Sequence, residues 1–223
     1  EWIELFNGKD LTGWRFQEPT ADSRWVVGTA ALDSQDARKL AVAPGGHELI
    51  SPVEPVKVIT AHGKGVDIYT ERKFADAVVE LEVMMAKGSN SGIYLMGEYE
   101  IQVMDSFGEA PAAKEMGGIY GIAAPLSNPC KPAGEWQKFV IEYRAPRFDN
   151  QATKTANARI VKVTLNGTVI HENVELPHAL NGGLSTGGTN IRGIELRTGP
   201  LMFQGNHGPV AYRNIRIKPL PTK

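Results

Sequence analysis

Short stretches in which apolar and polar residues alternate run along most of this chain, and they limit the possible folds more than any other feature. In the clearest stretch, Val79, Leu81 and Val83 alternate with Glu80 and Glu82. A period of two is typical of a β-strand with one buried face, whereas an amphipathic helix repeats every three to four residues. We find no window of about a dozen residues with a helical period. The sequence therefore predicts an all-β protein.

About a dozen segments have this character, and residues that favour turns lie between them. Asn166-Gly167 predicts a tight hairpin, because both residues tolerate the positive φ of a type I′ turn. We expect loops over Ala37–Lys64, Gly108–Gly134 and Pro177–Thr189. The predicted strands are Trp25–Val27, Ala30–Ser34, Val66–Thr70, Ala77–Ala86, Ser91–Met96, Tyr99–Asp105, Gln137–Arg144, Ala158–Leu165, Thr168–Glu172, Ile191–Arg197, Leu201–Gln204 and Val210–Ile217.

So many strands without a βαβ order indicate an antiparallel sandwich or jelly roll. The sequence contains no repeat, charge block or linker, so we expect one domain over residues 1–223. The 24 Lys and Arg nearly balance the 25 Asp and Glu, which argues against a nucleic-acid partner. No apolar run approaches the ~18–20 residues of a membrane-spanning helix.

The sequence does not identify a cofactor. Cys130 is the only cysteine, which excludes an intrachain disulfide and a cysteine-rich zinc site. The histidines lack the spacing of a transition-metal motif. A hard divalent cation bound through oxygen ligands stays open, and its ligands are unknown.

Acidic and amide side chains gather at period two in the centre of the chain. Around Tyr99–Asp105, Tyr99, Ile101 and Val103 predict the core face, and the opposite face carries Glu98, Glu100 and Gln102. Such a face suits general acid–base chemistry, binding of sugar hydroxyls or binding of a cation. It equally fits an ordinary solvated sheet face.

A series of ordered motifs covers the chain from about residue 4 to residue 220. They are Leu5-Phe6-Asn7-Gly8-Lys9-Asp10-Leu11-Thr12-Gly13-Trp14, Asn90-Ser91-Gly92-Ile93-Tyr94, Gly97-Glu98-Tyr99-Glu100-Ile101-Gln102-Val103-Met104-Asp105-Ser106, Gly118-Ile119-Tyr120-Gly121, Ala133-Gly134-Glu135-Trp136-Gln137, Leu165-Asn166-Gly167, Gly199-Pro200-Leu201 through Gln204, and Pro209-Val210-Ala211-Tyr212-Arg213-Asn214-Ile215-Arg216-Ile217. Together they resemble the 3-keto-disaccharide hydrolase family. One departure is the loop Gly205–Gly208, which lacks the acidic residue that commonly precedes His-Gly in the family.

The resemblance implies a concanavalin-like jelly roll of two curved antiparallel sheets with a carbohydrate groove. It implies cleavage of 3-keto-glycosides or 3-keto-disaccharides by removal of the C2 proton and β-elimination, with net hydrolysis. It also implies an exported protein, periplasmic or extracellular, whose signal peptide has been removed. A non-catalytic carbohydrate-binding module with the same groove is the alternative, because one fold supports both functions.

The residue pattern and the resemblance together single out candidate site residues. Glu100 is the first candidate for a catalytic carboxylate, and Glu82 is its candidate partner if their strands are neighbours. His207 lies in a glycine-flanked loop and can titrate near neutrality. The predicted substrate-binding residues are Gln102, Tyr94, Asn90, Asp105, Tyr120, Gln204 and Arg213.

Structural roles compete with these assignments. Asn90 and Asp105 also fit turns, and Arg213 also fits an ion pair that fastens the last strand. Large indole rings favour the core of a sandwich. The tryptophans expected there are Trp14, Trp25 and Trp136.

Overall fold

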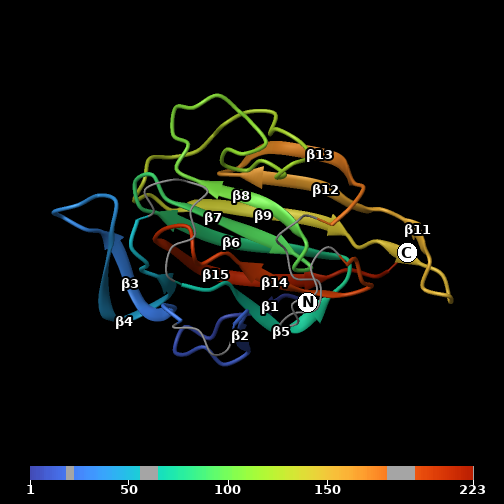
Figure 1. Ribbon diagram of the computed structural model, residues 1–223, viewed down its shortest axis with the longest axis horizontal. Helices are drawn as coiled ribbons and strands as arrows, with labels where there is room; N and C mark the ends of the chain where they lie inside the picture. The colour runs from blue at the N-terminus through green and yellow to red at the C-terminus, as the bar shows by residue number, and fades with distance from the viewer. Residues whose placement is uncertain (19–22, 56–64, 180–193, 223) are drawn as a thin grey trace.

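The computed structural model describes residues 1–18, 23–55, 65–179 and 194–222, and every regular element in these ranges is a β-strand (Figure 1). No helix in these ranges has the length and apolar character needed to cross a membrane. The strands are β1 (Ile3–Glu4), β2 (Trp14–Phe16), β3 (Val26–Leu32), β4 (Leu40–Ser51), β5 (Ile68–Phe74), β6 (Ala77–Met85), β7 (Asn90–Leu95), β8 (Tyr99–Met104), β9 (Gln137–Arg144), β10 (Arg147–Phe148), β11 (Lys154–Ala156), β12 (Ala158–Leu165), β13 (Thr168–Leu176), β14 (Gly199–Phe203) and β15 (Val210–Pro219).

Two antiparallel sheets form the sandwich. The large sheet has the order β13-β12-β9-β6-β15-β4-β3, with β1 added on β15, and the small sheet has the order β2-β5-β14-β7-β8. Apolar residues of both sheets belong to one core cluster, for example Leu81 of β6 and Ile93 of β7. The predicted all-β, antiparallel sandwich is therefore confirmed. In Figure 1 the hairpin of β3 and β4 projects from one end of the sandwich, and β11 lies at the other end.

The alternation in β6 divides its residues as the sequence predicts. Val79, Leu81 and Val83 have no exposed surface, whereas Glu80 and Glu82 lie on the opposite face. The predicted hairpin at Asn166-Gly167 is also confirmed, because both residues have positive φ values, 52° and 84°, and they connect β12 to β13.

Trp14 and Trp25 are buried in the core as expected. Trp136 instead packs from a half-buried position against a second, smaller cluster. The indole nitrogens of the two buried rings donate to the backbone oxygens of Leu5 and Val66, so their polar atoms are satisfied inside.

The loop prediction for Ala37–Lys64 is wrong over its first half. β4 spans Leu40–Ser51 and pairs with β3 through Leu40–Ala43 and Glu48–Ile50, with an irregularity between these two parts. Most of β4 up to Glu48 is exposed, so it lacks an alternating pattern, and Pro44-Gly45-Gly46 resembles a turn. A partner strand, not local propensity, makes this segment extended. The same pairing joins Trp25–Val27 and Ala30–Ser34 into the single strand β3.

The predicted strand at Ile191–Arg197 is wrong in its described part, residues 194–197, and its first three residues lie outside the described ranges. Side-chain hydrogen bonds, and not pairing with a strand of either sheet, hold this segment in place. Glu195 accepts hydrogen bonds from Tyr99 Oη and Lys154 Nζ, each 2.5 Å long, and Arg197 donates to the backbone of Phe148. The predicted loop at Gly108–Gly134 contains no strand, and most of the loop Pro177–Thr189 lies outside the described residues.

Candidate active site

The candidate site lies on the outer face of the small sheet, which we define as the face turned away from the shared core. In β7 and β8, Ile93 and Ile101 point into the core, so Tyr94 and Glu100 point outward. Tyr94 stands directly opposite Glu100 in the register of these two strands. Tyr69 and Met202 extend the same row across β5 and β14. The sheet therefore brings side chains from four strands together.

Gly92 makes room for the Glu100 carboxylate. Gly92 lies two residues before Tyr94 on the outer face, and a Cβ atom at this position would overlap Glu100 Oε1. The carboxylate of β8 therefore leans over the backbone of β7, toward β14. The sequence names this glycine only as part of a motif, because its role depends on a contact between two strands.

We expect Gly92→Ala to lower the rate of a reaction that depends on the Glu100 carboxylate by about 100-fold without unfolding the protein. The added methyl group must displace the Glu100 carboxylate, and a shift of about 1 Å in a reacting group costs this much. Turnover and circular dichroism of the purified variant check the prediction. As a control, Gly167→Ala changes a hairpin glycine with nothing within 4 Å of its Cβ position, so its cost falls on stability alone. Full activity in Gly92→Ala would contradict this account.

Glu100 exchanges its proton near neutrality. Its side chain is 7% exposed. This burial raises the pKa of Glu100 to about 7; a hydrogen bond from Tyr94 opposes the shift, and the negative charge of Asp67 adds to it. Burial and the nearby charges of Glu100 and Asp67 raise the pKa of Tyr94 well above its ordinary value, so this phenol keeps its proton. A carboxyl group that titrates near pH 7 is suited to general acid–base catalysis.

Gln204, directly after β14, completes this group. Its Nε2 atom donates to Tyr94 Oη at 3.2 Å. Its backbone is fixed on both sides, since its nitrogen donates to Gly92 O and its oxygen accepts from Ser91 Oγ. Ser91 also lies 2.7 Å from Tyr212 Oη, which belongs to the large sheet. The candidate site is therefore anchored through the core to the second sheet.

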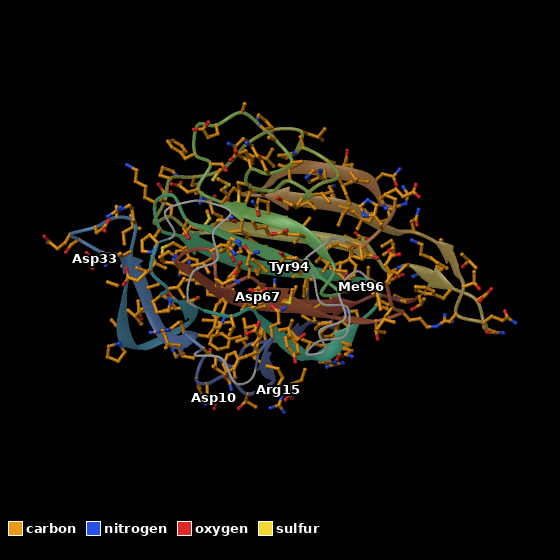
Figure 2. All side chains as sticks on the ribbon, in the orientation of Figure 1. Asp10, Arg15, Asp33, Asp67, Tyr94 and Met96 are labelled. Carbon is orange, nitrogen blue, oxygen red and sulfur yellow. The ribbon has the colours of Figure 1, made fainter. Side chains whose placement is uncertain are left out.

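Asp67 is a site residue that the sequence analysis missed. It is 6% exposed, lies directly before β5, and accepts the Gly205 N–H at 2.9 Å. Figure 2 labels Asp67 and Tyr94 close together, and the charge of Asp67 acts on both Tyr94 and Glu100. An acid between Val66 and Ile68 in a predicted strand was the available signal, because an acid with apolar neighbours is seldom buried without a role.

Two further predicted residues lie beside Glu100. Tyr120 is 45% exposed, and its backbone N–H donates to Glu100 O, so its ring stands where the site meets solvent. Gln102 follows Glu100 on the same face, but its Nε2 atom donates to the backbone oxygen of Lys114. The amide of Gln102 therefore holds the loop after β8 in place.

Asn90 begins β7 on the outer face, and its Oδ1 atom is buried without a hydrogen-bond partner. Asp105 Oδ2 accepts the Gly88 N–H at 2.8 Å, which is the turn role that the sequence left open. His207 lies in the loop after β14, three residues beyond Gln204, and its Nδ1 atom is 2.5 Å from Asn206 Oδ1.

Glu82 and Arg213 do not join this group. β6 and β15 belong to the large sheet, so Glu82 cannot be a strand neighbour of Glu100, and that expectation is wrong. Arg213 Nε donates to Glu82 Oε2 at 2.5 Å, and its guanidinium group stacks 4.0 Å from the centre of the Trp136 ring. This pair stabilises the last strand, as the structural interpretation of Arg213 predicted.

In the described part of the chain, no group of three or more His, Cys, Asp or Glu side chains is arranged to hold a metal ion. Asp67 and Glu100 are the acids of the site, and the amide oxygens of Asn90 and Gln204 are further potential oxygen ligands on the same face. What the arrangement offers is one carboxyl group with a near-neutral pKa, a phenol that keeps its proton, and several acceptors for hydroxyl groups.

Comparisons with known proteins agree with this architecture. A protein from Parabacteroides distasonis ATCC 8503, provisionally named a glycosyl hydrolase, has a crystal structure similar to this chain, with a TM-score of 0.66 and 25% identity over 98% of this chain and 84% of that one. A second protein of that organism with the same description gives a TM-score of 0.59 and 18% identity over 99% and 94% of the two chains, which shows the fold alone.

A curated relative is a 3-keto-disaccharide hydrolase from Bacteroides thetaiotaomicron, 23% identical over 167 residues. The match covers 63% of this chain and 51% of the relative, so the chain spans about half of that protein's length. The family described as 3-keto-alpha-glucoside-1,2-lyase-like domain matches residues 1–218. This chain therefore belongs to the 3-keto-alpha-glucoside-1,2-lyase-like family.

Proposed function

We propose that this chain cleaves glycosides whose sugar carries a ketone at C3, by elimination across the C1–C2 bond. The observation that carries the proposal is the buried Glu100 carboxyl group, whose pKa of about 7 matches a base working at neutral pH. The family membership and the name of the curated relative support the same substrate class.

The ketone makes this chemistry accessible to a single carboxylate. A carbonyl group at C3 acidifies the proton on C2, and the Glu100 carboxylate takes that proton as an enolate forms. The enolate then expels the oxygen on C1, and the proton on Glu100 passes to the leaving oxygen. Water adds across the resulting C1=C2 bond, with OH on C1 and H on C2, so the net reaction is hydrolysis. The paired carboxylates of an ordinary glycosidase are not needed.

Neighbouring residues serve this step by holding Glu100. Tyr94 keeps its proton at working pH and donates a hydrogen bond to the carboxylate, and Gln204 fixes the Tyr94 hydroxyl. Tyr120 offers an exposed ring next to Glu100 on which a sugar ring can stack. His207 stays a predicted catalytic residue. Export from the cell also stays a prediction, which fractionation of the source cells tests.

The deciding experiment compares two chromogenic substrates, a 3-keto-glucoside and the same glucoside without the ketone. We expect release of the aglycone from the keto compound alone. In D₂O, deuterium should enter C2 of the released sugar, because the C2 proton is removed and replaced. Release from both compounds would identify an ordinary glycosidase. If neither compound is cleaved but both bind, the chain is a carbohydrate-binding module and the catalytic proposal is wrong.

A further inference from the structure

Two buried carbonyl oxygens beside Glu100 have no hydrogen-bond donor. Asn90 is 8% exposed and its Oδ1 atom is unpartnered, and the Oε1 atom of Gln204 is buried and unpartnered too. Buried acceptors are nearly always paired in folded proteins, because leaving one unpaired is costly. Two such atoms next to a candidate active site point to a ligand that supplies the missing donors.

The two oxygens belong to one location on the sheet. The register of β14 with β7 places Gln204 across from Gly92, whose backbone oxygen accepts the Gln204 N–H at 3.0 Å. Asn90 lies two residues from Gly92 on the same face, which makes it a diagonal neighbour of Gln204. Because Gly92 has no side chain, nothing from β7 stands between them, and the Glu100 carboxylate leans into the same gap.

The chemistry of these atoms selects one kind of ligand. Amide oxygens accept hydrogen bonds from O–H groups, which a sugar has in excess. A carboxylate on the ligand would be repelled by the charge of Asp67 and, at a pH where Glu100 is ionised, by that of Glu100 as well. The groups that shift the pKa of Glu100 include no cation that could offset this repulsion. We propose that Asn90 and Gln204 form a hydroxyl-accepting subsite that binds uncharged sugars and rejects uronates; this rests on the proposed function.

A calcium ion is the competing occupant, since it also binds amide oxygens and carboxylates. It takes six to eight oxygen ligands, with several from carboxylates. Over the described ranges, no three His, Cys, Asp or Glu side chains are arranged to hold a metal ion. The observations therefore favour hydroxyl groups, and the ion becomes an arm of the test.

The test measures binding and stability in the variants Asn90→Leu and Gln204→Leu. The probes are methyl α-glucoside, which lacks the ketone that the proposed elimination needs, methyl α-glucuronoside, and CaCl₂ alone. Calorimetry and thermal unfolding follow their binding. We expect wild type to bind the glucoside and not the glucuronoside. Each variant should bind the glucoside about tenfold more weakly, the effect of one lost hydrogen bond.

Stability of the free protein separates this subsite from a structural role. Asn90→Leu removes an unpaired buried acceptor, so it should leave the melting temperature unchanged or raise it, whereas Gln204→Leu also removes the Nε2–Tyr94 Oη hydrogen bond and should lower it. Gln102→Leu is the matched control, since it removes an amide on the same face that holds the Lys114 backbone, and it should lower the melting temperature. If Asn90→Leu does not fold, Asn90→Ala gives the same comparison.

Several results would overturn the subsite. They are unchanged glucoside affinity in both leucine variants, equal binding of the glucuronoside, no binding of the glucoside to wild type, or stabilisation by CaCl₂ that the variants abolish. Its failure can be told from failure of the proposed function. If both variants cleave the keto substrate with an unchanged KM, the subsite proposal is wrong and the proposed function stands. If wild type binds the glucoside, the variants bind it about tenfold more weakly, and the keto substrate is not cleaved, only the catalytic proposal is wrong.

Discussion

Glu100→Gln should lower kcat/KM for a chromogenic 3-keto-glucoside by about 1,000-fold, in the range usual for loss of a general acid–base group. Glutamine fills the same space over Gly92 and can still accept a hydrogen bond from Tyr94, but it cannot take a proton from C2. The measurement is initial-rate kinetics at pH 7.5, with circular dichroism to confirm folding. Retention of more than a tenth of the wild-type rate would remove Glu100 from the chemistry.

Glu80→Gln is the matched control for this variant. Glu80 lies on the outer face of the large sheet, where it pairs with Arg216 and Lys138. The chemical change is identical, but the residue belongs to the other sheet, so activity should stay within about twofold, the scale of a surface substitution. Equal losses in the two variants would show that the effect comes from stability and not from catalysis.

The pH dependence follows from the same carboxyl group. With Glu100 as the proposed base, wild-type kcat/KM should rise with pH through about 7 and then level off, and this limb should vanish in Glu100→Gln. Stability should change in the opposite direction. The folded protein holds this proton up to about pH 7, whereas the unfolded chain releases it near 4.5. Wild type therefore loses stability relative to the glutamine variant as pH rises through this window, by on the order of 3 kcal/mol.

The elements that the sequence predicted correctly are those with a local pattern. β6 alternates strictly between core and outer residues, and Asn166-Gly167 has the turn chemistry that a hairpin requires. β4 escaped prediction because most of it before Glu48 faces solvent and contains Pro44 and two glycines, so only its pairing with β3 reveals it. Residues 194–197 contain apolar residues at strand-like spacing, yet side-chain bonds hold them outside the sheets.

The same distinction, between what a local pattern predicts and what only long-range pairing decides, applies to the candidate site. Period two placed Glu100 and Glu82 on outer faces correctly, but the local pattern of an acid is the same in either sheet. Which sheet a strand joins depends on pairing with residues far along the chain, and that pairing separates Glu82 from Glu100. Gly92 gains its role only from a contact across strands, so its neighbours along the chain could not assign it. For Asp67 the apolar neighbours were a signal of burial, but only the fold shows that its charge acts on Glu100.

The largest stability effect should come from Asp76, which fastens the start of β6 to β10. Its side chain has no exposed surface; Oδ1 accepts from Arg147 Nη1 at 2.8 Å and from the Ala145 N–H, and Oδ2 accepts from Arg147 Nη2 at 2.6 Å. Asp76→Ala leaves the guanidinium group and a buried N–H without this acceptor. Loss of one partner from a fully buried ion pair costs about 3–5 kcal/mol. Because the Arg147 side chain is 28% exposed and water can solvate part of its charge, we expect the lower end of this range, and unfolding in urea should begin at a lower concentration.

Asp36→Ala is the matched control, because Asp36 makes a similar two-point contact with Arg38 at the surface. Both side chains of that pair are reached by water, which solvates the arginine when its partner is removed. Asp36→Ala should therefore move the urea midpoint only slightly. Asp76→Asn, which keeps the shape and one acceptor, should lie between wild type and Asp76→Ala. If the two alanine variants unfold at the same urea concentration, burial does not set the strength of the Asp76 contact.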